Sequence, residues 1–137
     1  MKKTLPLLII TVFLTVTHSC ANAQKNRNTD VLEKDILFAD KQYGLMIEKL
    51  EDSARIVIPY SFNKGRMIYV RPQNWTSGFF PGSLWYLYEL TGEEKWKPLA
   101  IKYTEILDTI QYYTKNHDVG FMINCSYGNG LRLTGNS

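Results

Sequence analysis

Residues 75–92 decide the fold, and they read WTSGFFPGSLWYLYELTG. Their apolar side chains recur at helical spacing, so that Leu84, Leu87 and Tyr88 form one stripe. A stripe of this kind buries one face of a helix against a core. The stretch therefore predicts an amphipathic helix over residues 78–91.

Both ends of this helix carry recognisable signals. Thr76 or Ser77 is expected to cap the N-terminus, because a hydroxyl oxygen can accept a hydrogen bond from a free backbone N–H. Pro81 suits the first turn, where a missing N–H costs little. Gly92 is expected to end the helix, because glycine adopts the left-handed conformation without strain.

A second helix is predicted over residues 93–114, with acidic Glu93 and Glu94 at its N-terminus. Its apolar residues are three or four positions apart: Trp96, Leu99, Ala100, Tyr103, Ile106, Leu107, Ile110 and Tyr113. A turn of only about two residues separates it from the preceding helix, which makes the two helices antiparallel neighbours.

The flanking regions predict a further helix and two loops. Helical periodicity covers residues 31–54, and Asp30 with Glu33 resembles a capping box at its start. Residues 56–71 contain Pro, Asn and Gly and are interpreted as a loop with a short extended piece. Residues 117–136 carry four glycines among polar and aromatic residues, and they are interpreted as a loop followed by the start of another helix.

The N-terminus is predicted to direct export. Lys2 and Lys3 precede an apolar run over residues 5–16 that is too short to span a membrane, which needs about 20 apolar residues. Residues 1–23 therefore resemble a signal peptide. A competing route cleaves before Cys20, within a lipobox-like sequence, and would attach a lipid there. Both routes predict a periplasmic or cell-envelope protein that contacts a membrane only through such an anchor.

The mature region is divided into a polar linker, residues 24–30, and one domain, residues 31–137. Its composition is that of a globular protein, with 45% hydrophobic and 21% charged residues. The net charge of +3 falls to 3 − 2 = +1 without Lys2 and Lys3, so nucleic acid is not indicated as a partner. Two cysteines give no metal framework, and Cys125 is interpreted as a small buried hydrophobe.

Two residues stand out as candidates for chemistry. Most acids lie on predicted helix faces, where solvation explains them, whereas Asp118 follows a helix and lies beside an apolar stretch. Apolar neighbours disfavour a charged carboxylate, which suits proton transfer, although an Asp near a Gly is also common in turns. Trp75 could stack on a sugar ring or anchor the core.

Two motifs resemble those of a known enzyme family. Residues 75–92 are similar to one signature of the unsaturated glucuronyl hydrolases, glycoside hydrolase family 88, and His117-Asp118-Val119-Gly120-Phe121-Met122 is similar to a second. The resemblance implies an all-α fold, the N-terminal part of an (α/α)₆ toroid of paired helices. It also implies removal of the unsaturated uronic acid from lyase-generated oligosaccharides, without a metal or organic cofactor.

The same resemblance assigns roles to single residues. Asp118 matches one of the family's two essential aspartates, while His117 and Trp75 match residues that line the substrate site. The other aspartate, which the family uses as proton donor, is expected beyond Ser137. The chain is accordingly interpreted as truncated and inactive by itself.

Two alternatives remain open at this point. Unsaturated rhamnogalacturonyl hydrolases share the toroid and the hydration chemistry. A non-catalytic glycan-binding surface lipoprotein would keep the aromatic residues and would not need Asp118.

Overall fold

A computed structural model describes residues 29–50 and 57–135 of the chain. The chain divides into two compact units, Met1–Phe38 and Ala39–Ser137. Residues 29–38 are the described part of the first unit, and all of them are helical. The predicted signal peptide, Cys20 and residues 24–28 of the predicted linker lie outside the described residues. So do residues 51–54, the end of the first predicted helix.

The first helix occupies residues 29–50 of the described chain. Asp30 lies inside this helix, so the predicted capping box does not mark its beginning. In the second unit, Ile47 and Leu50 are buried, and Tyr43 packs against the core one turn earlier. The periodicity that predicted this helix is therefore the periodicity of its buried face.

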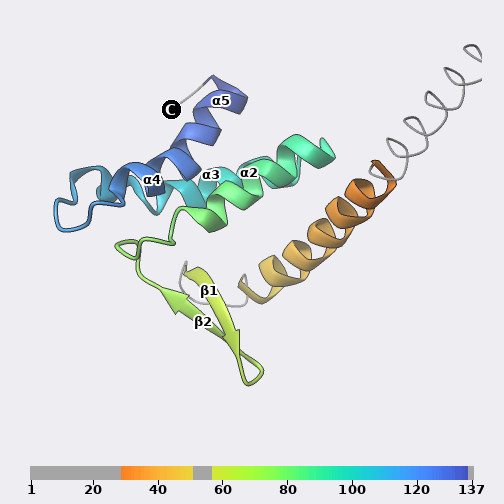
Figure 1. The fold of residues 1–137 in the computed structure, drawn as a ribbon, viewed down its shortest axis with the longest axis horizontal. Coiled ribbons are helices and arrows are strands. Elements are labelled where there is room, and N and C mark those ends of the chain that lie inside the picture. The colour runs from red at the N-terminus through yellow and green to blue at the C-terminus, as the bar shows by residue number, and fades with distance from the viewer. Residues whose placement is uncertain (1–28, 51–56, 136–137) are drawn as a thin grey trace, which may run out of the picture. The chain divides into compact units, whose positions relative to one another are not determined.

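A β-hairpin follows where a loop with a short extended piece was predicted (Figure 1), so the loop prediction is wrong and only the extended piece is confirmed, as the second strand. Strand β1, Ile58–Asn63, pairs antiparallel with strand β2, Arg66–Val70, and an irregularity lies between Pro59 and Ser61. Lys64 and Gly65 connect the strands with φ angles of 47° and 80°. Two successive positive φ angles are typical of the tight turn whose twist matches that of paired strands.

Helix α2 spans Phe79–Thr91 and confirms the predicted helix almost to the residue. Pro81 lies in its first turn, and Gly92 ends it with φ 68° and an N–H that donates to the carbonyl of Tyr88. The predicted caps are wrong, because Gly78 is the N-cap and no side chain caps the helix. The Ser77 hydroxyl donates instead to the carbonyl of Pro72, at 2.7 Å.

Helix α3 is shorter than predicted, since it spans Trp96–Glu105 and is followed by a 3₁₀ helix, η1, over Asp108–Tyr112. Its contacts confirm the antiparallel arrangement with α2. Phe80 at the start of α2 meets Tyr103 near the end of α3, with ring centroids 4.7 Å apart. At the other end of the pair, Lys97 near the start of α3 lies over the ring of Tyr88 near the end of α2, with Nζ 5.8 Å from the ring centroid. The Trp85 indole N–H also donates to the buried Thr104 hydroxyl, at 3.0 Å.

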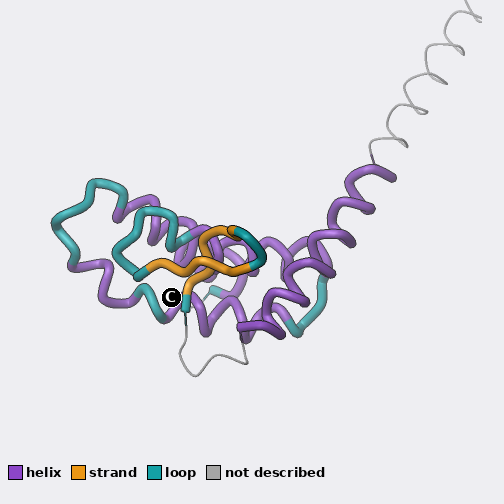
Figure 2. Tube along the Cα trace, turned by 90° about the horizontal axis from the view of Figure 1, so that it is seen from below, coloured by secondary structure: helices purple, strands orange, loops and turns teal. Residues whose placement is uncertain are grey.

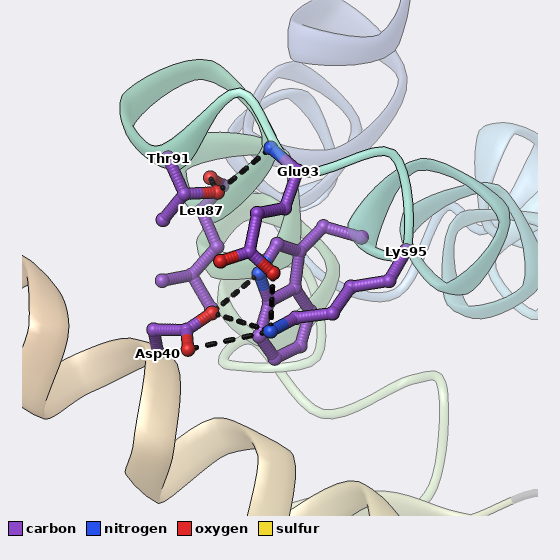
Figure 3. Close-up of polar contacts among 6 residues, drawn as sticks. Asp40, Leu87, Thr91, Glu93 and Lys95 are labelled. Atoms are coloured by element: carbon purple, nitrogen blue, oxygen red, sulfur yellow. Dashed lines mark hydrogen bonds and ion pairs between the residues drawn. The ribbon is translucent and has the colours of Figure 1, made fainter.

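Polar contacts fix the connection between α2 and α3 (Figure 3). The Thr91 hydroxyl donates to the carbonyl of Leu87 and accepts from the N–H of Glu93. Lys95 pairs with Glu93 and, at 3.0 Å, with Asp40 of the first helix. Hydrogen bonds to these two carboxylates raise the pKa of Lys95. The connection of four residues, 92–95, is thus held from both sides.

Residues 119–134 form an unbroken helical run, so the predicted loop is limited to the residues before it. The run comprises α4, Val119–Ile123, then a π-helical segment η2, Asn124–Gly128, and then α5, Asn129–Thr134, as Figure 2 shows by the continuous helical trace. Gly135 ends it with φ 73°. The glycines of this run are typical of loops, but Gly130 makes room for the Trp85 ring. A Cβ at Gly130 would lie 3.1 Å from that ring.

The core of the second unit is formed by helices, with Leu84, Leu107 and Met122 fully buried among its largest apolar side chains. The hairpin contributes Ile58 to this core. The chain is therefore mostly helical, as predicted, with one small sheet in addition. Within the described residues, no helix is long and apolar enough to cross a membrane.

Candidate active site

Asp118 lies immediately before α4, at the end of the loop that follows η1. Its backbone N–H donates to the Asn116 side-chain oxygen at 2.9 Å, and its carbonyl accepts from the N–H of Met122. These backbone bonds fix the residue, while its carboxylate caps no helical N–H. The side chain is 34% exposed. The carboxylate is therefore held in place and remains open to a ligand.

His117 lies beside this carboxylate. Its Nε2 is 3.4 Å from Oδ1 of Asp118, and its side chain is 94% exposed. The contact is an ion pair only when the imidazole is protonated. With so few other contacts, the ring can turn toward a bound molecule without a large packing cost.

Trp75 lies in the turn that leads into α2, and half of it is exposed. The side-chain oxygen of Asn74 accepts hydrogen bonds from the N–H and the hydroxyl of Thr76, at 3.0 and 2.7 Å. With the Ser77–Pro72 bond on its other side, the backbone that carries Trp75 is well fixed. The indole is thus an exposed aromatic surface on a rigid turn, and the structure does not bury it in the core.

Two phenylalanines connect Trp75 to the region of Asp118. The Trp75 and Phe79 rings meet edge to face with centroids 5.8 Å apart, and the Phe79 and Phe121 rings do so at 5.1 Å. Phe121 is three residues after Asp118 in the chain, which is about one helical turn. Trp75, Phe79 and Phe121, here called the aromatic ladder, are each 41–50% exposed. The structure thus brings together the two segments that carry the candidate residues.

Backbone contact brings these segments together. A Cβ at Gly78 would lie 2.4 Å from the carbonyl oxygen of Met122, and one at Gly82 would lie 2.8 Å from that of Cys125. Only glycine permits so close an approach of α2 to α4 and η2. The α2/α4 contact therefore determines how far Trp75 lies from Asp118.

Sequence reasoning missed Phe79 and Phe121 as members of the site. Phe79 is four residues after Trp75 and Phe121 three after Asp118, so each lies one helical turn from a candidate. That spacing was the available signal. It could not show that the two rings touch, because the contact joins residues 42 positions apart by numbering, 121 − 79.

A groove of about 280 Å³ lies between α2 and the η2–α5 segment. Its lining includes Phe79, Tyr86, Asn124 and Cys125. Burial raises the pKa of the Cys125 thiol, which disfavours the thiolate needed for nucleophilic chemistry. Cys125 therefore lines the groove as a half-buried, unreactive side chain. Among the residues that the structure describes, no three metal-binding side chains gather at one place.

An ion pair joins α2 to α5 near this groove. Arg132 donates from both terminal nitrogens to the two carboxylate oxygens of Glu89, at 2.7 Å each. The hydrogen bonds from Arg132 lower the pKa of Glu89. This bidentate geometry neutralises the guanidinium. Arg132 is accordingly not a free cation for an anionic ligand.

Comparison with known proteins finds relatives that share one name. No family model matches the chain. An unsaturated glucuronyl hydrolase from Formosa agariphila is 43% identical over 63 residues, which are 46% of this chain and 16% of the relative. One from a Bacillus species is 37% identical over 57 residues, which are 39% of this chain and 15% of the relative. The aligned residues thus span about a sixth of the length of these curated relatives.

A solved structure gives the same result. The crystal structure of an unsaturated glucuronyl hydrolase specific for heparin is 49% identical, with a TM-score of 0.56, over 58% of this chain and 22% of that chain. The predicted fold is thereby confirmed, since the helical pairs are part of the (α/α)₆ toroid of that family. Together, these likenesses show that this chain is similar, in sequence and in structure, to a part of the unsaturated glucuronyl hydrolases.

Proposed function

We propose that this chain forms part of a hydrolase that removes the unsaturated uronic acid from the non-reducing end of lyase-generated oligosaccharides. The observation that carries the proposal is the joining of Trp75 to the Asp118 segment through Phe79 and Phe121. An exposed aromatic surface beside an open carboxylate suits a sugar that must be both stacked and protonated. The named relatives support the reaction class, glycoside hydrolysis.

The proposed reaction starts at the C4=C5 double bond of the sugar, which is a vinyl ether. A proton adds to C4, and the ring oxygen shares the positive charge that develops at C5. Water then adds its oxygen to C5 and releases a proton. The resulting hemiketal opens, C1 becomes a hemiacetal, and its collapse releases the next sugar as an alcohol.

We assign Asp118 to this reaction as a charge-stabilising and orienting group, with His117 beside it. Acid–base work on a sugar generally uses two carboxylates. The family resemblance gives proton donation to the other one, and the 3.4 Å contact gives Asp118 a neighbouring imidazole. Trp75 is proposed to stack on the sugar ring. No metal or organic cofactor enters the proposal.

Asp118→Asn in the full-length protein tests this assignment. The test incubates the protein with unsaturated disaccharides from chondroitin, heparin and hyaluronan and follows the ultraviolet absorbance of the conjugated double bond. We expect the wild type to remove the band on at least one of them. The variant should be slower by about 10²–10³-fold, the usual cost of removing one group that stabilises charge in the transition state.

Asp108→Asn is the matched control, because Asp108 is an exposed aspartate at the start of a 3₁₀ helix outside the ladder. It should keep the wild-type rate. A wild-type protein that leaves the band intact on all three disaccharides contradicts the proposal. It would favour a rhamnogalacturonan-derived substrate or a glycan-binding role, for which binding without turnover is the signature.

We further propose that the protein acts after export, because Lys2, Lys3 and the apolar run at 5–16 have the pattern of a signal peptide. The mass of the mature N-terminus measures this directly. Cleavage after residue 23 gives an unmodified N-terminus, whereas cleavage before Cys20 gives a mass increased by lipid. An uncleaved N-terminus in the native host contradicts export.

A further inference from the structure

Phe79 borders a second groove and, together with Ser83, also lines the groove already described. The second groove has a volume of about 530 Å³ and lies between the first helix, the hairpin and the start of α2. Of the aromatic ladder, Phe79 is the residue that lines it. It is called here the hairpin groove. A ligand that leaves the candidate site past Phe79 would enter it.

The walls of the hairpin groove are aromatic. Tyr60 and Phe62 of β1 line the groove, and their large side chains are 54% and 63% exposed. Large exposed apolar surfaces of this kind often mark binding sites. Its deeper part is formed by Tyr43 and Phe80, whose rings are stacked with an interplanar angle of 12°. Flat aromatic surfaces that face an open groove are suited to the C–H faces of pyranose rings.

Polar groups in the same groove suit a sugar better than an apolar partner. Gln42, Ser61 and Ser83 supply an amide and two hydroxyls, which can exchange hydrogen bonds with sugar hydroxyls. Apolar walls with a few polar groups are the usual composition of a small-molecule site. An entirely apolar partner would leave these groups without hydrogen bonds.

The charge of this region favours an anionic ligand. Lys49 lines the groove, and none of the described acidic residues does. Residues 57–73, which contain the hairpin, carry Lys64, Arg66 and Arg71 and no acidic residue. Within the described part of the chain, none of these four cations takes part in an ion pair. Their field therefore attracts anions toward the groove.

We propose that the hairpin groove binds the remainder of the substrate, namely the sugars that follow the unsaturated uronic acid in an anionic oligosaccharide. This inference rests on the proposed function, because Phe79 lines the groove and its ring contacts Trp75 and Phe121 of the candidate site. The groove makes the protein prefer longer anionic fragments over disaccharides. Tyr60 and Phe62 provide the stacking surface, and Lys49 provides the charge.

The test compares kcat/KM of the full-length protein on an unsaturated disaccharide and on the tetrasaccharide from the same polysaccharide. Tyr60→Ala and Phe62→Ala should each lower the tetrasaccharide value about fivefold, as expected from losing an aromatic contact, and leave the disaccharide value within about twofold. Both side chains are more than half exposed, so the variants should fold. Lys49→Gln should lower the tetrasaccharide value most at low salt.

Tyr69→Ala is the matched control. Tyr69 lies on β2 of the same hairpin and is 42% exposed, but it is not among the residues that line the groove. This variant should leave both substrates unchanged. If Tyr69→Ala lowers kcat/KM for the tetrasaccharide as much as Tyr60→Ala does, the hairpin acts only as a support, and the groove proposal is overturned.

The remaining outcomes are also decisive. If the disaccharide is hydrated normally and none of the groove variants lowers the tetrasaccharide value selectively, the groove proposal is wrong and the proposed function stands. A wild-type protein that hydrates neither substrate overturns the function, and the groove proposal with it.

Discussion

The α2/α4 contact and the β1–β2 hairpin are stabilised in different ways. At the first, two helices meet backbone to backbone, with Gly78 under the carbonyl of Met122 and Gly82 under that of Cys125. At the second, two strands pair with each other, and most of their residues are exposed. One region gains its order from close packing, the other from a tight turn and a two-stranded ladder.

This difference matches what each region would do. The α2/α4 contact sets the distance between Trp75 and Asp118, and chemistry on a small sugar needs that distance held closely. The hairpin presents Tyr60 and Phe62 to a longer and more variable part of a ligand. A two-stranded hairpin is only marginally stable by itself, so it can adjust. We therefore expect mutations in the first region to disturb folding and catalysis, and mutations in the second to act locally.

Gly78→Ala should give the largest effect of this comparison. The added methyl would lie 2.4 Å from the carbonyl oxygen of Met122 and 2.8 Å from its Cα, and neither backbone atom can rotate away. Because α2 and α4 must separate, we expect a loss of about 3 kcal/mol in the free energy of unfolding. The measurement is urea denaturation, together with turnover of an unsaturated disaccharide.

Gly120→Ala provides the control for this variant. Gly120 lies in the same helix as Met122, yet a Cβ there meets nothing within 4 Å. Alanine is the better helix former, so this change should raise stability by about 0.5–1 kcal/mol. If both glycine variants lost stability equally, helix formation and not the close approach would be the cause.

The same glycines explain which parts of the fold the sequence could predict. The bounds of α2 followed from its apolar stripe and from Gly92, since both signals lie within the helix or next to it. The helical run 119–134 was missed because Gly128 and Gly130 look like turn residues. Gly130 makes room for Trp85, a residue 45 positions away by numbering, 130 − 85. A single sequence does not distinguish a glycine that turns the chain from one that lets another element approach.

The hairpin was missed for a related reason. Its turn is Asn63-Lys64-Gly65-Arg66, in which lysine occupies a position with positive φ that asparagine or glycine usually takes. In the site, Trp75 and Asp118 were identified by their residue types and motifs. Phe79 and Phe121 were not, because an aromatic residue next to a helix start is equally expected in a core. Only the fold shows that the two rings meet.

Gly65→Ala sharpens the comparison from the side of the hairpin. Gly65 has φ 80°, where a Cβ is strained by about 1–2 kcal/mol, although it would meet no other atom within 4 Å. The strain acts on the turn alone. We therefore expect the amides of β1 and β2 to exchange with solvent about tenfold faster, while the exchange of the α2 amides is unchanged.

Lys64→Asn, at the neighbouring position, should have the opposite effect on hydrogen exchange, because asparagine tolerates the φ of 47° that lysine adopts there. It should slow hydrogen exchange in the hairpin severalfold. This change in rate should be smaller than the acceleration caused by Gly65→Ala. Hydrogen exchange followed by mass spectrometry measures both variants on the same peptides. If Gly65→Ala also accelerated exchange in α2, the hairpin would be part of the cooperative core and the contrast between the two regions would fail. If the effect stays within β1 and β2, the groove wall can move independently of the backbone contact that positions Trp75 and Asp118.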